Sequence, residues 1–144
     1  MDATRTVVQV FITSRLDWCN SLYYGITDKL MRRPQSVQNT AARLITGTRR
    51  CDHISLVLRQ LYWLPVRQHV NYKIVTLVHQ CLSGHAPSYL ADNCRLVTDA
   101  GVRRLRSADT RTLVVGRTLS SFGSRTFAAA APRLWNSLPS DRTP

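Results

Sequence analysis

The sequence predicts an all-α fold, a small irregular bundle of about four to six helices with a less ordered, basic C-terminal third. Apolar residues recur at spacings of three and four over several long stretches, which is the helical period. Glycine or proline follows most of these stretches, where helices commonly end. At 144 residues the chain has the length of one domain and can bury a core without disulfides or metal.

The first predicted helix covers residues 4–24 and ends at Gly25. Its expected core arc consists of Val7, Val8, Phe11, Trp18, Cys19 and Leu22. Gln9, Thr13 and Asn20 fall on the opposite, solvent side. Arg15 projects within the apolar arc, so we expect its stem to lie on the core with its head outward, or its charge to pair with a carboxylate.

The central predicted helix covers residues 27–47, with Thr27 or Asp28 as its cap and Gly47 as its left-handed end. At 100° per residue, the expected core face holds Leu30, Val37, Ala41, Leu44 and Ile45. The opposite face holds Arg32, Ser36, Asn39 and Arg43. Two arginines about 16 Å apart on one face can reach separate phosphates of one nucleic-acid strand. An ordinary solvated helix face is the alternative.

Pro34 conflicts with this helix, because proline in a helix interior costs about 3 kcal/mol. Either the helix kinks at Pro34, or its regular part begins there. The second choice would remove Arg32 from the polar face and leave Asn39 and Arg43.

A polar connector, residues 48–53, follows and supplies Arg49 and Arg50 as further candidate phosphate contacts. We expect a short helix over 54–61, with Asp52 as a possible cap. The clearest helix covers 65–83, begins at Pro65 and ends at Gly84. Its core face contains Val66, Val70, Ile74, Leu77, Val78, Cys81 and Leu82, opposite Gln68, Tyr72 and His79.

The remaining chain reads as a short helical turn at 85–90, a mobile basic linker, an extended piece at 112–115 and a helix over 121–131 ended by Pro132. Trp135 and Leu138 are expected to anchor the end on the helices. The predicted organisation is a helical region (1–91), a linker (92–111) and a C-terminal segment (112–144). Arg103, Arg104 and Arg106 crowd the linker.

The charge predicts a polyanionic partner. The formal net charge is +12, carried by 18 Arg and 2 Lys against 8 Asp and no Glu. Arginine binds phosphate bidentately and stacks on bases, which favours RNA or DNA over an incidental excess of charge. A basic surface that keeps the chain in solution, or that meets anionic lipid, is the alternative. The candidate nucleic-acid contacts are Arg32, Asn39, Arg43, Arg49, Arg50, Arg103, Arg104 and Arg106.

No catalytic constellation is recognisable, and we expect no enzyme activity, cofactor or small-molecule substrate. The aspartates are well separated, and the glycine-rich phosphate motifs and the Gly-x-Ser-x-Gly motif are absent. His79, Cys81, His85 and Cys94 suggest zinc, but His79 and Cys81 point about 200° apart on a helix. We therefore expect no metal site, with Cys81 in the core.

The location is expected to be intracellular, nuclear or cytoplasmic, and not secreted. The opening residues lack a signal peptide's apolar run and cleavage site. No window reaches the length of a membrane span. The four cysteines form no Cys-x-x-Cys pair and are expected to be reduced thiols.

Five motifs in order carry a family resemblance: SRLDWCNSLYYG (14–25), VQNTAARLITG (37–47), LYWLPVR (61–67), APSYL (86–90) and APRLWNSLP (131–139). Together they resemble the region after the palm in reverse transcriptases of LINE-type non-LTR retrotransposons of the jockey-like group. The resemblance covers roughly residues 12–139.

This resemblance implies a thumb-like set of helices that grips a template-primer duplex, with Arg32, Asn39 and Arg43 on or near the backbone-contacting face. The palm aspartates of an RNA-directed DNA polymerase and the endonuclease domain have no counterpart in the sequence. Pro34 and Gly116 depart from the family pattern, as expected of a truncated or decaying copy. The expectation is a non-catalytic remnant that binds nucleic-acid backbone. The alternative is an incompletely folded interaction fragment that associates with itself through exposed apolar faces.

Overall fold

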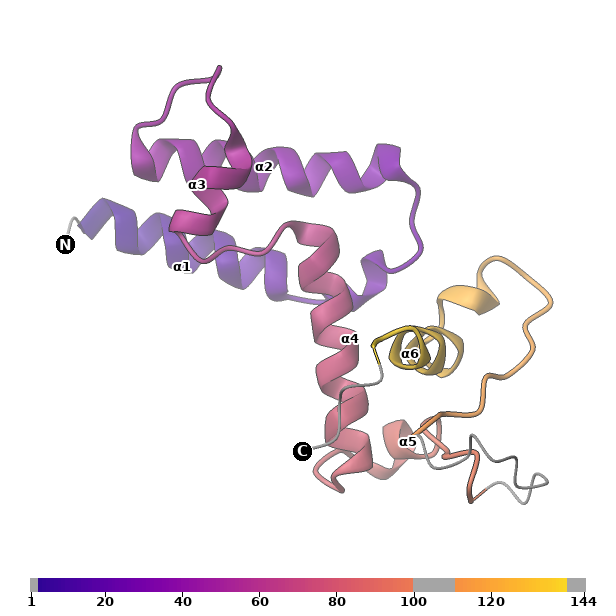
Figure 1. The fold of residues 1–144 in the computed structure, drawn as a ribbon. Helices are drawn as coiled ribbons and strands as arrows, with labels where there is room; N and C mark the ends of the chain where they lie inside the picture. Colours follow the sequence, from indigo (N-terminus) through magenta and orange to yellow (C-terminus); the bar gives the residue numbers. More distant parts are fainter. Residues whose placement is uncertain (1–2, 100–110, 140–144) are drawn as a thin grey trace. The chain divides into compact units, whose positions relative to one another are not determined.

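The computed structural model describes residues 3–99 and 111–139, and most of these residues are helical (Figure 1). The elements are α1 (Ala3–Asp17), η1 (Asn20–Tyr23), α2 (Asp28–Thr46), α3 (Ile54–Gln60), α4 (Val66–Leu82), α5 (Ser88–Ala91), η2 (Gly123–Arg125) and α6 (Phe127–Asn136). Within the described ranges no strand forms, although an isolated bridge pairs Leu96 with Leu113. The predicted all-α class is confirmed.

The chain divides into two compact units, Met1–Val70 and Asn71–Pro144. The division falls within α4, so each unit contains part of that helix. The three-part organisation expected from the sequence stays a prediction.

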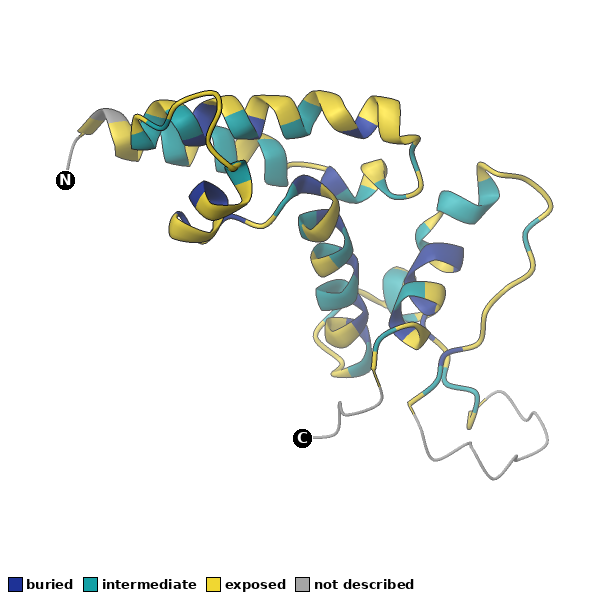
Figure 2. Cartoon of the chain, turned by 45° about the horizontal axis from the view of Figure 1, so that its top comes forward, coloured by how far each residue is buried: buried dark blue, intermediate teal, exposed yellow. Residues whose placement is uncertain are grey.

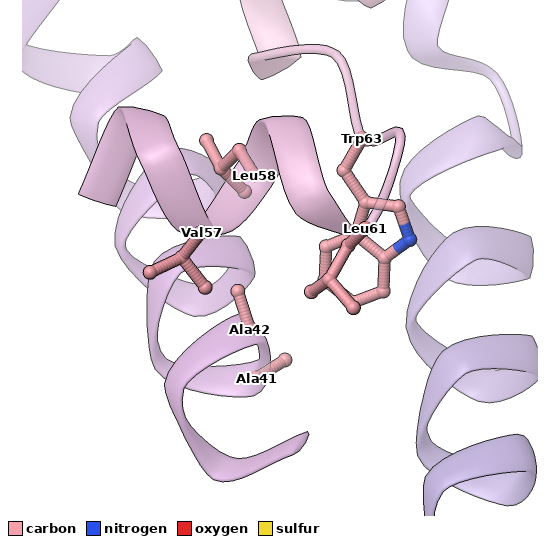
Figure 3. Packing of buried hydrophobic residues seen from close by; sticks show 6 residues of the cluster. All are labelled: Ala41, Ala42, Val57, Leu58, Leu61 and Trp63. Atoms are coloured by element: carbon pink, nitrogen blue, oxygen red, sulfur yellow. The ribbon is translucent and has the colours of Figure 1, made fainter. Parts of the chain in front are cut away.

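In the first unit, α1 and α2 lie side by side and run in opposite directions (Figure 1). A cluster of buried side chains joins α2 to α3 and to the turn that follows α3 (Figure 3). The cluster consists of Ala41, Ala42, Val57, Leu58, Leu61 and Trp63. Val8 and Ile12 of α1 pack against it, together with Ile45 and Ile54. The two small alanines leave room for the larger side chains of α3.

The core face of α2 differs from the predicted one. Leu30, Val37 and Leu44 were expected in the core, but they are 48%, 52% and 70% exposed. The buried positions are Met31, Gln38, Ala41 and Ala42. At 100° per residue the helix is turned by about 80° from the orientation that its apolar residues alone indicate.

Glutamine side chains explain this rotation. Gln38 is 4% exposed, and its Nε2 donates to the carbonyl oxygen of Leu64 at 2.9 Å. Gln35 Nε2 donates to Gln38 Oε1 at 2.9 Å and to Asn39 Oδ1 at 2.8 Å. Gln35 Oε1 accepts from the backbone N–H of Val66 at 2.9 Å. The first N–H groups of a helix have no partner within it, so Gln35 caps α4 from a different helix.

Pro34 lies inside α2, which begins at Asp28. The alternative that the regular helix begins at Pro34 is therefore wrong, and Arg32 belongs to α2. Gly47 ends α2 in the left-handed region with φ 67°, as predicted. The cap of α3 is His53, not Asp52, whose carboxylate instead accepts from the N–H of Arg49 at 3.0 Å.

The predicted helix over 4–24 is two pieces, because Cys19 takes a left-handed conformation with φ 53° between α1 and η1. Its predicted core arc is largely wrong. Val7, Phe11, Trp18 and Leu22 are exposed. Asn20, placed on the solvent side by its polarity, is 1% exposed.

The side chain of Arg15 is exposed, and its guanidinium lies over the Phe11 ring at 5.5 Å from the centroid. This is a cation–π contact. Neither expected arrangement for Arg15 applies, because the ring beneath it is itself on the surface.

In the second unit, α4 buries Ile74, Val78 and Cys81 and exposes Tyr72 and His79, as predicted. Gly84 follows it with φ 73°. The strongest sequence prediction is thus confirmed.

The final helix is shifted relative to its prediction. It was expected over 121–131 with Pro132 as its end, but α6 begins at Phe127 and continues through Pro132 to Asn136. Pro132 lacks the N–H that would bond to the carbonyl of Ala128, and Ala128 is exposed. Water can satisfy that carbonyl, so the proline is tolerated.

Trp135 and Asn136 attach α6 to an extended segment. Trp135 is buried, and its Nε1 donates to the carbonyl of Arg111 at 2.7 Å. Asn136 Oδ1 accepts from the N–H of Leu113 at 3.0 Å, and its Nδ2 donates to the Leu113 carbonyl at 2.9 Å. The side-chain amide of Asn136 thus pairs with the backbone of Leu113 as a neighbouring strand would. These bonds hold α6 to the segment at 111–113, and the expected packing of Trp135 and Leu138 on the other helices stays a prediction.

We predict that Gln38→Met destabilises the fold by about 1–3 kcal/mol, because the thioether fills a similar volume but leaves the carbonyl of Leu64 without its donor. Chemical denaturation monitored by circular dichroism measures this change. Ser36→Ala, at an exposed position of the same helix, is the control and should shift the midpoint little. An unchanged midpoint in the Gln38 variant would show that water replaces the bond at no cost.

Candidate nucleic-acid interface

The side chains predicted to contact nucleic acid differ in their exposure and in their bonding within the protein. Those of Arg32, Arg49 and Arg50 are exposed, and in the described chain no hydrogen bond or ion pair engages them. Asn39 and Arg43 are partly buried and bonded within the protein. The remaining three predicted contacts, Arg103, Arg104 and Arg106, lie outside the described residues.

Arg43 holds the connector that follows α2. Its Nη2 donates to the carbonyl oxygens of Arg50 at 3.4 Å and of Asp52 at 3.3 Å. Its Nε is buried and has no partner among the described residues. Moving this guanidinium to a phosphate would free two backbone carbonyls, so Arg43 serves the fold before any ligand.

Asn39 is committed in the same way. Its Oδ1 accepts from Gln35, within the amide group that joins α2 to the start of α4. Both residues had been placed on an open polar face because they lie opposite Leu30 and Leu44 on the helix. The actual rotation of α2 brings Asn39 to the flank of the core face, whereas Arg43 stays on the outer side, where the connector covers it.

The connector turns tightly around Asp52. The Asp52 side chain accepts from the backbone N–H of Arg49 at 3.0 Å, and the Asp52 N–H donates to the Arg49 carbonyl at 3.2 Å. The bonds of Asp52 to the Arg49 backbone and of the Arg43 side chain to two backbone carbonyls fix the turn. The side chains of Arg49 and Arg50 are exposed to solvent. The connector therefore presents two adjacent cations on a braced loop.

A second group of cations lies at the beginning of α2. Lys29, Arg32 and Arg33 are exposed, and no bond within the described chain engages their side chains. At 100° per residue they span an arc of about 100° over little more than one turn. We call these three residues the α2 cationic patch. Figure 2 shows α2 exposed along most of its outer side.

The neighbouring acid, Asp28, does not neutralise this patch. Its Oδ1 forms an ion pair with Arg67 of α4 within the first unit. That pairing also removes Arg67 from the set of uncommitted cations. The charge of Asp28 at the first turn of α2 is favourable for the helix dipole as well.

Lys29 and Arg33 were missed by the sequence interpretation. Their spacing of four residues places them on one helix face, a signal that the sequence contains. They were passed over because the predicted rotation of α2 placed Arg33 next to apolar residues expected to be buried. Exposure of Leu30 and Val37 brings Arg33 to the surface with them.

Comparison with protein-family models, with curated proteins and with solved structures finds no match for this chain. In the ranges that the structure describes, no helix has the length and hydropathy to cross a bilayer. In the same ranges, no three histidine, cysteine or aspartate side chains gather as metal ligands.

We predict that Arg43→Ala accelerates tryptic cleavage after Arg49 and Arg50 by about two- to tenfold, because the loss of one or two hydrogen bonds makes opening of the connector easier. Limited proteolysis followed by mass spectrometry measures the rate at each bond. Arg32→Ala removes an exposed arginine and should leave cleavage in the connector unchanged. Equal rates in the native chain and the Arg43 variant would contradict the bracing role.

Proposed function

We propose that this chain is a non-catalytic, thumb-like part of a LINE-type reverse transcriptase that holds RNA or DNA backbone through its cations, inside the cell. The observation that carries the proposal is the α2 cationic patch, whose three side chains are exposed and form no ion pair with an aspartate among residues 3–99 and 111–139. The net charge of +12 and the five sequence motifs support it.

The spacing of the exposed cations suits a strand of phosphates. Thirteen residues of helix separate Arg33 from Thr46, the last residue of α2, which is about 20 Å at 1.5 Å per residue. Arg49 and Arg50 follow directly. Along one strand of a duplex, about 20 Å corresponds to roughly six nucleotide steps of 3.4 Å. The two groups of cations would therefore contact phosphates several nucleotides apart.

No chemical step is part of this proposal. The sequence offers no pair of neighbouring aspartates for the two metal ions that nucleotide polymerisation requires. Contacts to phosphate position a nucleic acid without reading its bases. The proposed activity is thus binding that depends on backbone charge.

We predict that the affinity of the chain for a duplex oligonucleotide falls steeply with salt, and that Arg32→Ala makes the logarithmic slope shallower by about 0.9, the value for one phosphate contact. Fluorescence anisotropy over a range of salt concentrations measures both slopes. Arg43→Ala is the matched control, since its guanidinium is engaged by the connector, and its slope should stay near that of the native chain. A slope near zero for the native chain, or equal losses in both variants, would contradict the proposal.

An interaction fragment is the second candidate, and the exposed apolar side chains of the first unit favour it. Leu30, Val37 and Leu44 recur every seven residues and form an apolar stripe on α2. On α1, Val7, Val10 and Phe11 are 66%, 61% and 57% exposed. Large exposed apolar surfaces mark protein–protein contacts or promote self-association. The second candidate is therefore a segment that packs on another protein or on itself.

We predict that replacing Val37 and Leu44 by Gln weakens any self-association of the purified chain and leaves its thermal unfolding little changed, because both side chains are already half or more exposed. Sedimentation velocity over a concentration series measures the association. Ser36→Gln, on the same helix, is the control.

The shape of the thermal transition separates the two candidates. A cooperative loss of the helical circular dichroism signal on heating supports a folded nucleic-acid-binding domain. A gradual loss of that signal supports the incompletely folded fragment. If the double variant associates as strongly as the native chain, the stripe on α2 is not the contact.

A further inference from the structure

Cys81 and Cys94 form a pair of buried thiols that the sequence motifs do not reveal. Cys81 lies in the last turn of α4, and Cys94 follows α5 in the same unit. Each is 8% exposed, and neither is in a disulfide.

The pair lines a cavity of about 420 Å³. Leu82 and Leu96 supply apolar walls, and Arg95 and Asp99 add charged groups. Arg95 and Asp99 are both exposed, so the cavity has a polar, accessible side. A small molecule that carries charged groups and a sulfur centre can therefore approach the two thiols.

Burial, followed by the charge of Cys81 and a hydrogen bond with Cys81, raises the pKa of the Cys94 thiol to about 12. Cys94 therefore keeps its proton near neutral pH. A disulfide between the two residues then needs an external oxidant.

We propose that Cys81 and Cys94 are a dithiol modification site, which low-molecular-weight disulfides of the glutathione class oxidise to a reversible Cys81–Cys94 disulfide. One thiol of the pair loses its proton to solvent and attacks one sulfur of the small disulfide, whose S–S bond breaks and releases one thiolate. That thiolate takes a proton. The second thiol of the pair then loses its proton and attacks the protein sulfur of the mixed disulfide, and a second small thiolate leaves and takes a proton.

In the net reaction, the protein dithiol and one small disulfide give one protein disulfide and two small thiols. The bond would tie the last turn of α4 to the segment after α5.

A metal ion is a weaker occupant, because structural zinc takes four ligands and the described residues bring no third ligand to these two thiols.

The test uses the full chain with Cys19→Ser and Cys51→Ser, which removes the two exposed thiols and leaves the buried pair native. The reduced protein is incubated with oxidised glutathione, alkylated and mapped by mass spectrometry without reduction. We expect a peptide linked through Cys81 and Cys94, no lasting glutathione adduct, and full reversal by dithiothreitol. The melting temperature should rise by about 5–10 °C on closure, because the bond restricts the unfolded chain.

Single variants test the resolving step. In the same background, Cys94→Ser and Cys81→Ser should each keep a glutathione adduct on the remaining cysteine until dithiothreitol removes it, because the second thiol is absent. Loss of that adduct without added thiol would overturn the role of the second thiol. Lasting adducts on the intact pair, or no reaction while the protein remains folded by circular dichroism, would overturn the site itself. That last measurement needs no substitution at either buried cysteine.

Discussion

The first unit depends on a pair of side-chain amides, of which Gln38 is buried and Gln35 is partly buried. Gln35 and Gln38 of α2 bond to the backbone at Val66 and Leu64, and so tie the central helix to the start of α4. Burying a primary amide without partners costs several kcal/mol, so this pair must face the segment that satisfies it. Its position fixes the rotation of α2 about its own axis. Met31, Ala41 and Ala42 then face inward, and the larger Leu30, Val37 and Leu44 face solvent.

Bonds within the first unit decide which of its cations are available to a ligand. Arg43 is drawn against the carbonyls of the connector, and Arg67 is paired with Asp28. Arg32 and Arg33 are exposed and have no such partner in the part of the chain that the structure describes. An arginine-rich composition therefore overstates the binding capacity of the chain, because part of that charge braces loops and helix ends. Two groups of exposed cations, at the beginning of α2 and in the connector after it, are left in the first unit.

The sequence predicted the elements better than their orientation. Gly47, Gly84 and Pro65 mark helix ends by local backbone chemistry, which acts whatever the tertiary contacts are. The rotation of a helix depends on distant partners, and no local pattern shows that Gln38 meets the Leu64 carbonyl. The burial of Asn20 was missed because the chain leaves the helix at Cys19, where φ is 53°, and the positions after it no longer follow the helical period. The meeting of Cys81 with Cys94 across α5 could not be read from their spacing either.

The two proposed functions use adjacent surfaces of one helix and differ in their physics. Fully burying a Leu or Val side chain contributes about 1.5–3 kcal/mol and depends weakly on salt. Contacts between cations and phosphate are screened, and the affinity they give falls with each increase in ionic strength. A thumb that packs on the rest of a polymerase needs the first kind of contact, and a grip on nucleic acid needs the second. The apolar stripe and the cationic patch of α2 are therefore compatible within one molecule, since one side of the helix can dock while its neighbour holds phosphate.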